Sequence, residues 1–420
     1  MSPRKSSQLA VRPAAPQPAE RTNGAKRANR PNRKRHFHIA DLHGVGRLAL
    51  KAVESIADLA ETMQGGAGGK ALPGMDALGI FRNNARQLSA WLDRRFDTAL
   101  ARHRHAAFSP EREAVLSALN GVIGDYLAES AHPWAIAMHL RSQGKALRIE
   151  KRALAQRFPD AQRKILVMVH GLCRNDLQWR RRGHDHGLAL ARELGYTPLY
   201  LHYNSGRHVS HNGRELAMLL ELLVEQWPVE VRQLDLLCHS MGGLVARSAC
   251  HYAGEYGHAW PRRLRKMVFL GTPHHGSPIE RGGNWLVAVL DRNMLTLPLA
   301  RFGRVRSAGI TDLRYGNLLD EDWQGRDREH KDDCRRPVPL PAGVKCYAIA
   351  GAAGRREADL RSRFLGDGLM MPESALGRHD DRLRDLALPP ARQWIAYGVN
   401  HLELLDSRNV YGKLLEWMRG

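Results

Sequence analysis

The chain has little of what stabilises small secreted proteins or holds proteins in membranes. Only five of its 420 residues are cysteine, they are scattered, and no C-x-x-C pair occurs, which excludes a disulfide framework and a zinc ribbon. An odd number of cysteines suits a reducing compartment. No apolar stretch approaches the roughly 20 residues of a membrane span, and no apolar segment follows the basic N-terminus. We therefore expect a cytoplasmic protein with no signal peptide and no transmembrane segment.

Acidic residues are few relative to basic ones. The chain has 64 Lys and Arg against 43 Asp and Glu, a net charge of +21, while 43% hydrophobic residues suffice for a sizeable core. Residues 1–40 hold ten Lys and Arg and one Glu, a composition that predicts a disordered basic tail. We interpret this tail as a solvated segment. The alternative is peripheral contact with an anionic membrane, and nucleic acid is the less favoured partner.

Residues 42–155 carry a helical pattern of hydrophobicity. Apolar side chains recur at spacings of three and four, as in Ala49, Val53 and Ile56, and a later helix is expected from about Pro110 to Leu127. This pattern predicts a helical extension that packs against the main domain.

After residue 160 short apolar runs alternate with helical patterns. Helices are expected near 184–194, 212–226, 242–256 and 407–418, between apolar runs at 165–169, 198–203, 234–238, 267–270, 344–350 and 394–397. Continuous apolar strands that alternate with helices predict an α/β fold, with a mainly parallel sheet covered on both faces. The long connection after the fourth run predicts a lid-like insertion at about 277–340.

A candidate nucleophile follows the 234–238 strand. The segment Cys238–Gly243 reads C-H-S-M-G-G, which matches the nucleophile elbow G-x-S-x-G except that Cys238 replaces the first glycine. Such an elbow turns sharply from strand to helix and presents the hydroxyl of Ser240. The alternative is that Ser240 only caps the following helix.

A serine nucleophile needs a histidine base and an acid that orients it. Asp367, between two glycines, follows the 344–350 strand, and His401 follows the 394–397 strand. The order Ser, acid, His predicts a catalytic triad of Ser240, Asp367 and His401. Asp380 and Asp381 are less favoured acids, because they lie further from the strand and lack the glycine turn.

Acyl transfer also needs two backbone N–H groups aimed at the oxyanion. We expect these from Met241, directly after the serine, and from Leu172, in the loop that follows the 165–169 strand. No metal or other cofactor is expected, because His184-Asp185-His186 and His274-His275 lack the spacing of a metal site. The residues expected to line the substrate cleft are His170, Gly171, His239 and Asn204.

These motifs, together with L-G-T-P-H-H-G-S at 270–277, resemble those of α/β-hydrolases of the lipase/esterase type, including bacterial lipases and proteins similar to GPI-inositol deacylase. The resemblance covers about 160–420, and the helical region resembles extensions on uncharacterised bacterial members. It implies a serine carboxylic-ester hydrolase that acts through an acyl-enzyme on an ester or lipid. The alternatives are an acyltransferase with the same triad, or a catalytically inactive protein that binds anionic membrane or nucleic acid. The oligomeric state is left open.

Overall fold

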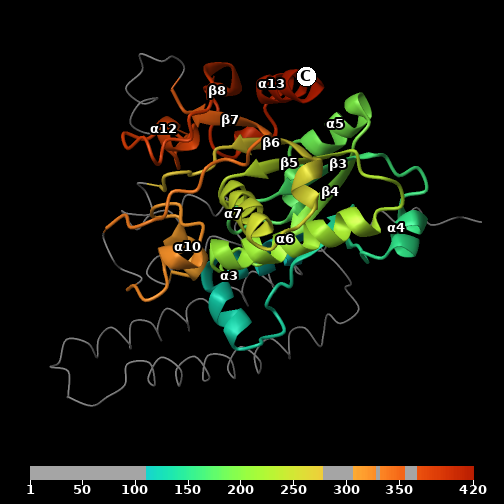
Figure 1. Ribbon diagram of the computed structural model, residues 1–420, viewed down its shortest axis with the longest axis horizontal. Helices are drawn as coiled ribbons and strands as arrows, with labels where there is room; N and C mark the ends of the chain where they lie inside the picture. Colours follow the sequence, from blue (N-terminus) through green and yellow to red (C-terminus); the bar gives the residue numbers. More distant parts are fainter. Residues whose placement is uncertain (1–109, 278–305, 328–331, 355–366) are drawn as a thin grey trace, which may run out of the picture. The chain divides into compact units, whose positions relative to one another are not determined.

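The apolar runs predicted after residue 160 are parallel strands of one eight-stranded sheet (Figure 1). The computed structural model describes residues 110–277, 306–327, 332–354 and 367–420. All of them belong to one unit of the chain, Gly44–Gly420. The parallel strands, which pair in the order β4-β3-β5-β6-β7-β8, are β3 Lys164–Val169, β4 Thr197–His202, β5 Gln233–His239, β6 Leu264–Leu270, β7 Lys345–Ala352 and β8 Gln393–Tyr397.

Two antiparallel strands extend the sheet beyond β4. They are β1 His139–Ser142, which pairs with β4, and β2 Lys145–Ala146, which pairs with β1. Helical structure was expected through residue 155, and for these residues that prediction is wrong. The reason is that β1 is a short strand in which only Leu140 is a buried apolar residue, so neither a helical nor a strand period stands out.

The helices predicted between the strands are confirmed within a few residues. The helices are α3 Pro110–Glu129, α4 Lys151–Arg157, α5 His186–Leu194, α6 Val209–Gln226, α7 Met241–Glu255, α10 Ala308–Asp312, α12 Pro372–Ala375 and α13 Arg408–Arg419. Asp185 caps the start of α5 by accepting a hydrogen bond from Leu188 N, and Gly195 ends it with a φ of 70°.

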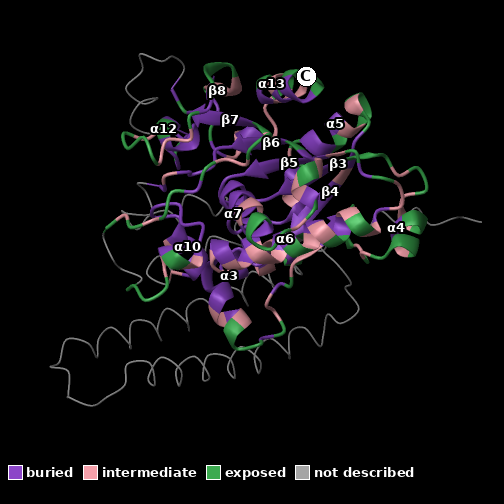
Figure 2. Ribbon diagram, viewed as in Figure 1, coloured by how far each residue is buried: buried purple, intermediate pink, exposed green. Residues whose placement is uncertain are grey.

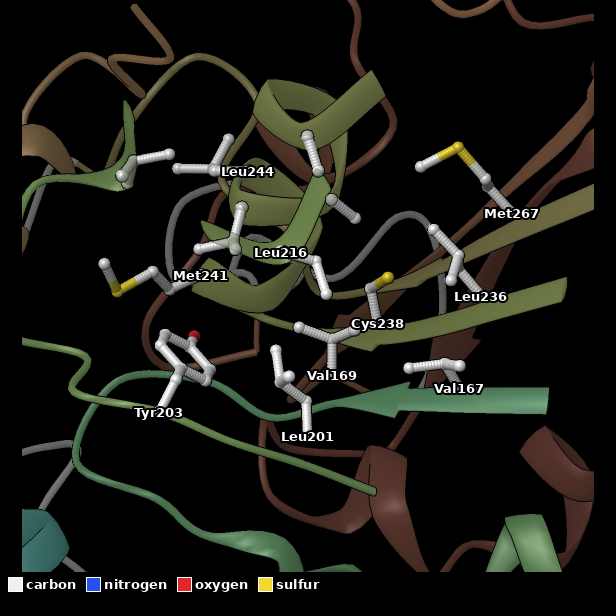
Figure 3. Close-up of a cluster of buried hydrophobic side chains, with 14 of the residues drawn as sticks. Val167, Val169, Leu201, Tyr203, Leu216, Leu236, Cys238, Met241, Leu244 and Met267 are labelled. Carbon is white, nitrogen blue, oxygen red and sulfur yellow. The ribbon is translucent and has the colours of Figure 1, made fainter. Parts of the chain in front are cut away.

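Successive residues of the central strands enter two separate cores. Val169 packs with side chains of α6 and α7, whereas Leu166 and Met168 pack with side chains of α5 and α13. Figure 3 shows Leu216 of α6 and Leu244 of α7 on the side of the sheet that Val169 faces. The strands are therefore buried on both faces (Figure 2). A mainly parallel sheet in the order β2-β1-β4-β3-β5-β6-β7-β8, with helices on both faces, is an α/β-hydrolase fold.

Several predicted segments lie outside the described residues. These are the basic tail at 1–40, the helical extension up to residue 109 and the apolar first part of the insertion, residues 278–305. The described later part of the insertion contacts α3, because Ser307 Oγ donates to Gly121 O at 2.7 Å and Ala308 N donates to Asp125 Oδ2 at 2.9 Å. A lid at 278–305 stays a prediction. Among the described helices, none combines the length and apolarity needed to cross a membrane.

Candidate active site

Ser240 occupies a strained turn between β5 and α7. Its φ of 54° and ψ of −129° lie outside the regions that L-residues favour, and its N–H donates to Leu270 O at the end of β6 at 2.8 Å. The Ser240 side chain makes no capping hydrogen bond to α7, so the interpretation as a simple helix cap is wrong. The strand, the strained serine and the helix form the elbow that the sequence predicts.

Small residues let neighbouring main chain approach this elbow. A Cβ atom at Gly171 would lie 2.8 Å from Ser240 Cβ, and one at Gly242 would lie 2.4 Å from Val169 O. Cys238, in place of the first glycine of the motif, is fully buried in the core between the sheet and α7 (Figure 3). Burial raises the pKa of the Cys238 thiol well above its ordinary value, which disfavours the nucleophilic thiolate.

Asp367 and His401 meet at the end of β7 and β8. His401 Nδ1 lies 2.7 Å from Asp367 Oδ2, and the two side chains are 5% and 0% exposed. The other carboxylate oxygen, Asp367 Oδ1, accepts hydrogen bonds from Leu369 N at 2.9 Å and Met370 N at 2.8 Å. The carboxylate is therefore fixed on both sides. With Nδ1 donating to Asp367, the basic nitrogen of a neutral His401 ring is Nε2.

The other acids considered for this role lie elsewhere. Asp380 and Asp381 are both exposed, and Asp381 pairs with Arg384 at 3.4 Å. The structure thus brings Asp367, and neither of these residues, to His401.

His239 ties the loop of His401 to the elbow. Its Nε2 lies 3.1 Å from His401 O, and the two ring centroids are 4.7 Å apart. The ring is 2% exposed, and burial lowers the pKa of His239 well below its ordinary value, so the imidazole is neutral and Nε2–H donates. These contacts are structural, and the predicted substrate contact of His239 stays a prediction.

The two N–H groups expected at the oxyanion are buried and free of protein partners in the described structure. Leu172 and Met241 are 1% and 0% exposed, and no described residue accepts a hydrogen bond from either backbone N–H. Cys173, with a φ of 59°, turns the loop after Leu172, and its N–H donates to Ser205 Oγ at 3.0 Å. Buried N–H groups without partners are rare, and a pair next to a serine suits an oxyanion.

His170 and Asn204 support the surrounding loops. His170 stacks on Tyr203 with ring centroids 4.3 Å apart and donates from Nδ1 to Gly171 O at 2.8 Å. Burial lowers the pKa of His170 to about 3. Asn204 Nδ2 donates to Gly124 O of α3 at 2.7 Å. The polar atoms that make these bonds serve main-chain partners, so a substrate contact by either side chain stays a prediction.

A buried ionic network that the sequence does not predict lies next to the loop that follows β3. Arg141 Nη1 of β1 lies 2.7 Å from Glu113 Oε2 of α3 and 3.0 Å from Asp176 Oδ1, a few residues after Leu172. His202 lies within 3.8 Å of both carboxylates, and burial lowers its pKa to about 2. The network fixes the loop to β1 and α3. The sequence held no signal for it, because its members are far apart along the chain.

Two of the histidines considered for a metal, His184 and His186, contact each other. His184 Nε2 lies 2.8 Å from His186 Nδ1, and His186 Nε2 donates to Leu404 O at 2.9 Å. Across the described ranges, no group of three or more His, Cys, Asp or Glu is placed to hold a metal ion. The pair links the start of α5 to the loop before α13.

Comparison with known proteins gives one family match and several structural likenesses. A domain of unknown function, DUF7379, matches residues 138–311. No curated protein matches the sequence significantly. The mature form of the lipase BlEst2 of Bacillus licheniformis is 16% identical, with 66% of this chain and 98% of that chain covered and a TM-score of 0.39. A hyperthermophilic esterase from the archaeon Pyrobaculum calidifontis is 14% identical, with 81% of this chain and 96% of that chain covered and a TM-score of 0.39. Lipase B of Aspergillus fumigatus is 11% identical, with 68% of this chain and 56% of that chain covered and a TM-score of 0.39. These values are low, so the fold assignment rests on the order and direction of the strands.

Proposed function

We propose that this protein is a serine carboxylic-ester hydrolase that acts through an acyl-enzyme, with Ser240 as nucleophile, His401 as base and Asp367 as the orienting acid. The observation that carries the proposal is the 2.7 Å hydrogen bond between His401 Nδ1 and Asp367 Oδ2. It joins two residues that are 34 apart in the sequence, and it lies at the carboxyl-end edge of the parallel strands, where the strained Ser240 also lies. A serine in a strained turn, without a capping role, fits a nucleophile better than a structural residue.

In the acylation step His401 Nε2 accepts the proton of Ser240 Oγ while Oγ bonds to the ester carbonyl carbon. The carbonyl oxygen becomes an oxyanion, which the N–H groups of Leu172 and Met241 stabilise. Asp367 stabilises the imidazolium that forms. The intermediate then breaks its bond to the leaving alcohol, which takes the proton from His401 Nε2.

In the deacylation step His401 Nε2 removes a proton from water, and the resulting oxygen nucleophile attacks the acyl-Ser240 carbonyl. Breaking the acyl–Oγ bond releases the carboxylic acid and returns the proton to Ser240. An alcohol acceptor in place of water would make the same steps an acyl transfer, which analysis of the products distinguishes. The substrate class is an ester or lipid.

Labelling with a fluorophosphonate tests the proposal, because only an activated serine reacts. We expect label on Ser240 of the full-length protein and hydrolysis within a series of p-nitrophenyl esters of increasing chain length. Ser240→Ala should remove the label and lower turnover by up to about 10⁶-fold. Ser130→Ala removes an exposed hydroxyl that bonds only its own helix end, so both signals should remain. A folded wild-type protein without label on Ser240 would favour the inactive binding protein instead.

A further inference from the structure

A polar pocket separate from Ser240, Asp367 and His401 lies beside α7. Its lining includes Arg247, His274, Asp322, Arg335, Arg336 and Arg384. His274 belongs to the L-G-T-P-H-H-G-S segment, which the proposed hydrolysis leaves without a role. Four guanidinium groups therefore converge on one small cavity.

Arg247 is a buried cation without an anionic partner in the described structure. It is 4% exposed, and its Nη groups contact His274 Nδ1 at 3.2 Å and Val338 O at 2.6 Å. Its Nε is buried without a hydrogen-bond partner, and no described carboxylate lies within ion-pair distance. Burial lowers the pKa of Arg247 to about 10, so the group still carries its charge at neutral pH. A buried charge of this kind is costly unless an anion accompanies it.

His274 offers a second unused donor in the same place. The ring is fully buried, and burial lowers its pKa well below the ordinary value, so the ring is neutral. Because Nδ1 accepts from Arg247, the ring proton is on Nε2. That Nε2 is buried and has no hydrogen-bond partner. Arg247 Nε–H and His274 Nε2–H are thus two buried donors that have no acceptor among the described residues.

The acidic groups near the pocket are already engaged. Asp322 accepts three backbone N–H bonds, at 2.8 to 2.9 Å. Asp333 binds Arg335 through both oxygens, at 2.9 and 2.8 Å, and also pairs with Arg384. Arg336 lies at the exposed rim, where its nearest acid, Glu321, is 3.9 Å away. The charge left over is positive, which favours an anion over a cation.

We propose that this pocket binds a phosphate group, free or at the end of a larger molecule, through Arg247 and His274. Both side chains line the pocket and each has an unused donor, and Arg336 at the rim would attract an anion. This inference does not depend on ester hydrolysis.

Calorimetric titration of the full-length protein with inorganic phosphate tests the proposal. We expect saturable binding, and a rise in Tm of about 2 °C or more over chloride at equal ionic strength. A titration with glycerol 3-phosphate separates a free ion from an esterified group. Equal effects of phosphate and chloride would indicate an adventitious ion only and overturn the proposal.

Variants place the binding in this pocket. His274→Asn keeps an acceptor near Arg247 but removes the Nε2–H, so the Kd for phosphate should rise at least about tenfold. Arg336→Gln changes only the exposed rim and should weaken binding by a smaller factor without affecting the fold. Arg148→Gln removes the same charge from an exposed pair with Glu150 and should leave the Kd unchanged. Wild-type affinity in folded His274→Asn, or in Arg336→Gln if the first variant does not fold, would overturn the assignment.

Discussion

A Cβ atom placed on Gly171 would lie 2.8 Å from the Cβ of Ser240, closer than side chains approach each other. The main chain of Gly171, in the loop that follows β3, therefore lies directly against the Ser240 side chain in the elbow that follows β5. Leu172, the next residue along this loop, is expected to supply an oxyanion N–H. The distance from that N–H to Ser240 thus depends on the absence of a side chain at position 171.

Gly171→Ala should lower kcat on a short ester by about tenfold or more, because the added methyl group displaces the loop from Ser240 and misplaces the oxyanion donor. Steady-state kinetics with p-nitrophenyl acetate measure the effect. Gly254→Ala is the matched control, since a Cβ at Gly254 of α7 meets nothing within 4 Å. Unchanged kcat in a folded Gly171→Ala protein would contradict the close approach.

Arg141→Met should destabilise the fold by about 3–5 kcal/mol, because it leaves the buried carboxylates of Glu113 and Asp176 without their cation. Urea unfolding followed by circular dichroism gives the free energy of unfolding. Arg148→Gln, which breaks an exposed ion pair with Glu150 beyond β2, should change it by less than about 1 kcal/mol. An equal decrease in the free energy of unfolding in the two variants would show that the network stabilises the fold no more than a surface ion pair does.

The strands after residue 160 could be predicted because burial on both faces turns each strand into a continuous apolar run. The contact between Asp367 and His401 could be predicted because each residue lies in a turn that follows a late strand. Strand β1 escaped prediction because Arg141, a charged residue, is buried in it through ion pairs made at long range. The burial of Arg247 could not be predicted either, because in the sequence this residue occupies an ordinary polar position of a helix. Its burial against Val338 O depends on a segment about 90 residues later.

Histidines that are buried in the neutral state should make the protein sensitive to acid. Burial lowers the pKa of His186 to about 4, against about 6.5 in an unfolded chain. Between these values the unfolded state binds more protons than the native state, so the free energy of unfolding falls as the pH is lowered from about 6.5 toward 4. Each such histidine contributes a slope of up to about 1.4 kcal/mol per pH unit. His186→Gln should reduce the slope measured by urea unfolding at pH 7, 6 and 5, and an unchanged slope would contradict this.

Asp367→Asn should lower turnover by about 10³–10⁴-fold with little change in substrate binding. Asp367 Oδ1 accepts from Leu369 N and Met370 N, while Oδ2 faces His401 Nδ1. An amide has only one acceptor oxygen, so its NH₂ group must face either the two backbone donors or the His401 N–H. Either orientation loses a hydrogen bond and the charge that stabilises the imidazolium. The measurement is kcat and KM on a soluble ester.

Asp380→Asn is the control for that substitution, because it removes one exposed carboxylate from the same part of the chain. It should leave kcat and KM within about twofold of wild type, since surface changes away from a site have small effects. The reverse pattern, with Asp380→Asn inactive and Asp367→Asn active, would move the acid away from Asp367. The hydrogen bond at His401 would then serve only to hold the loop after β8 against the end of β7.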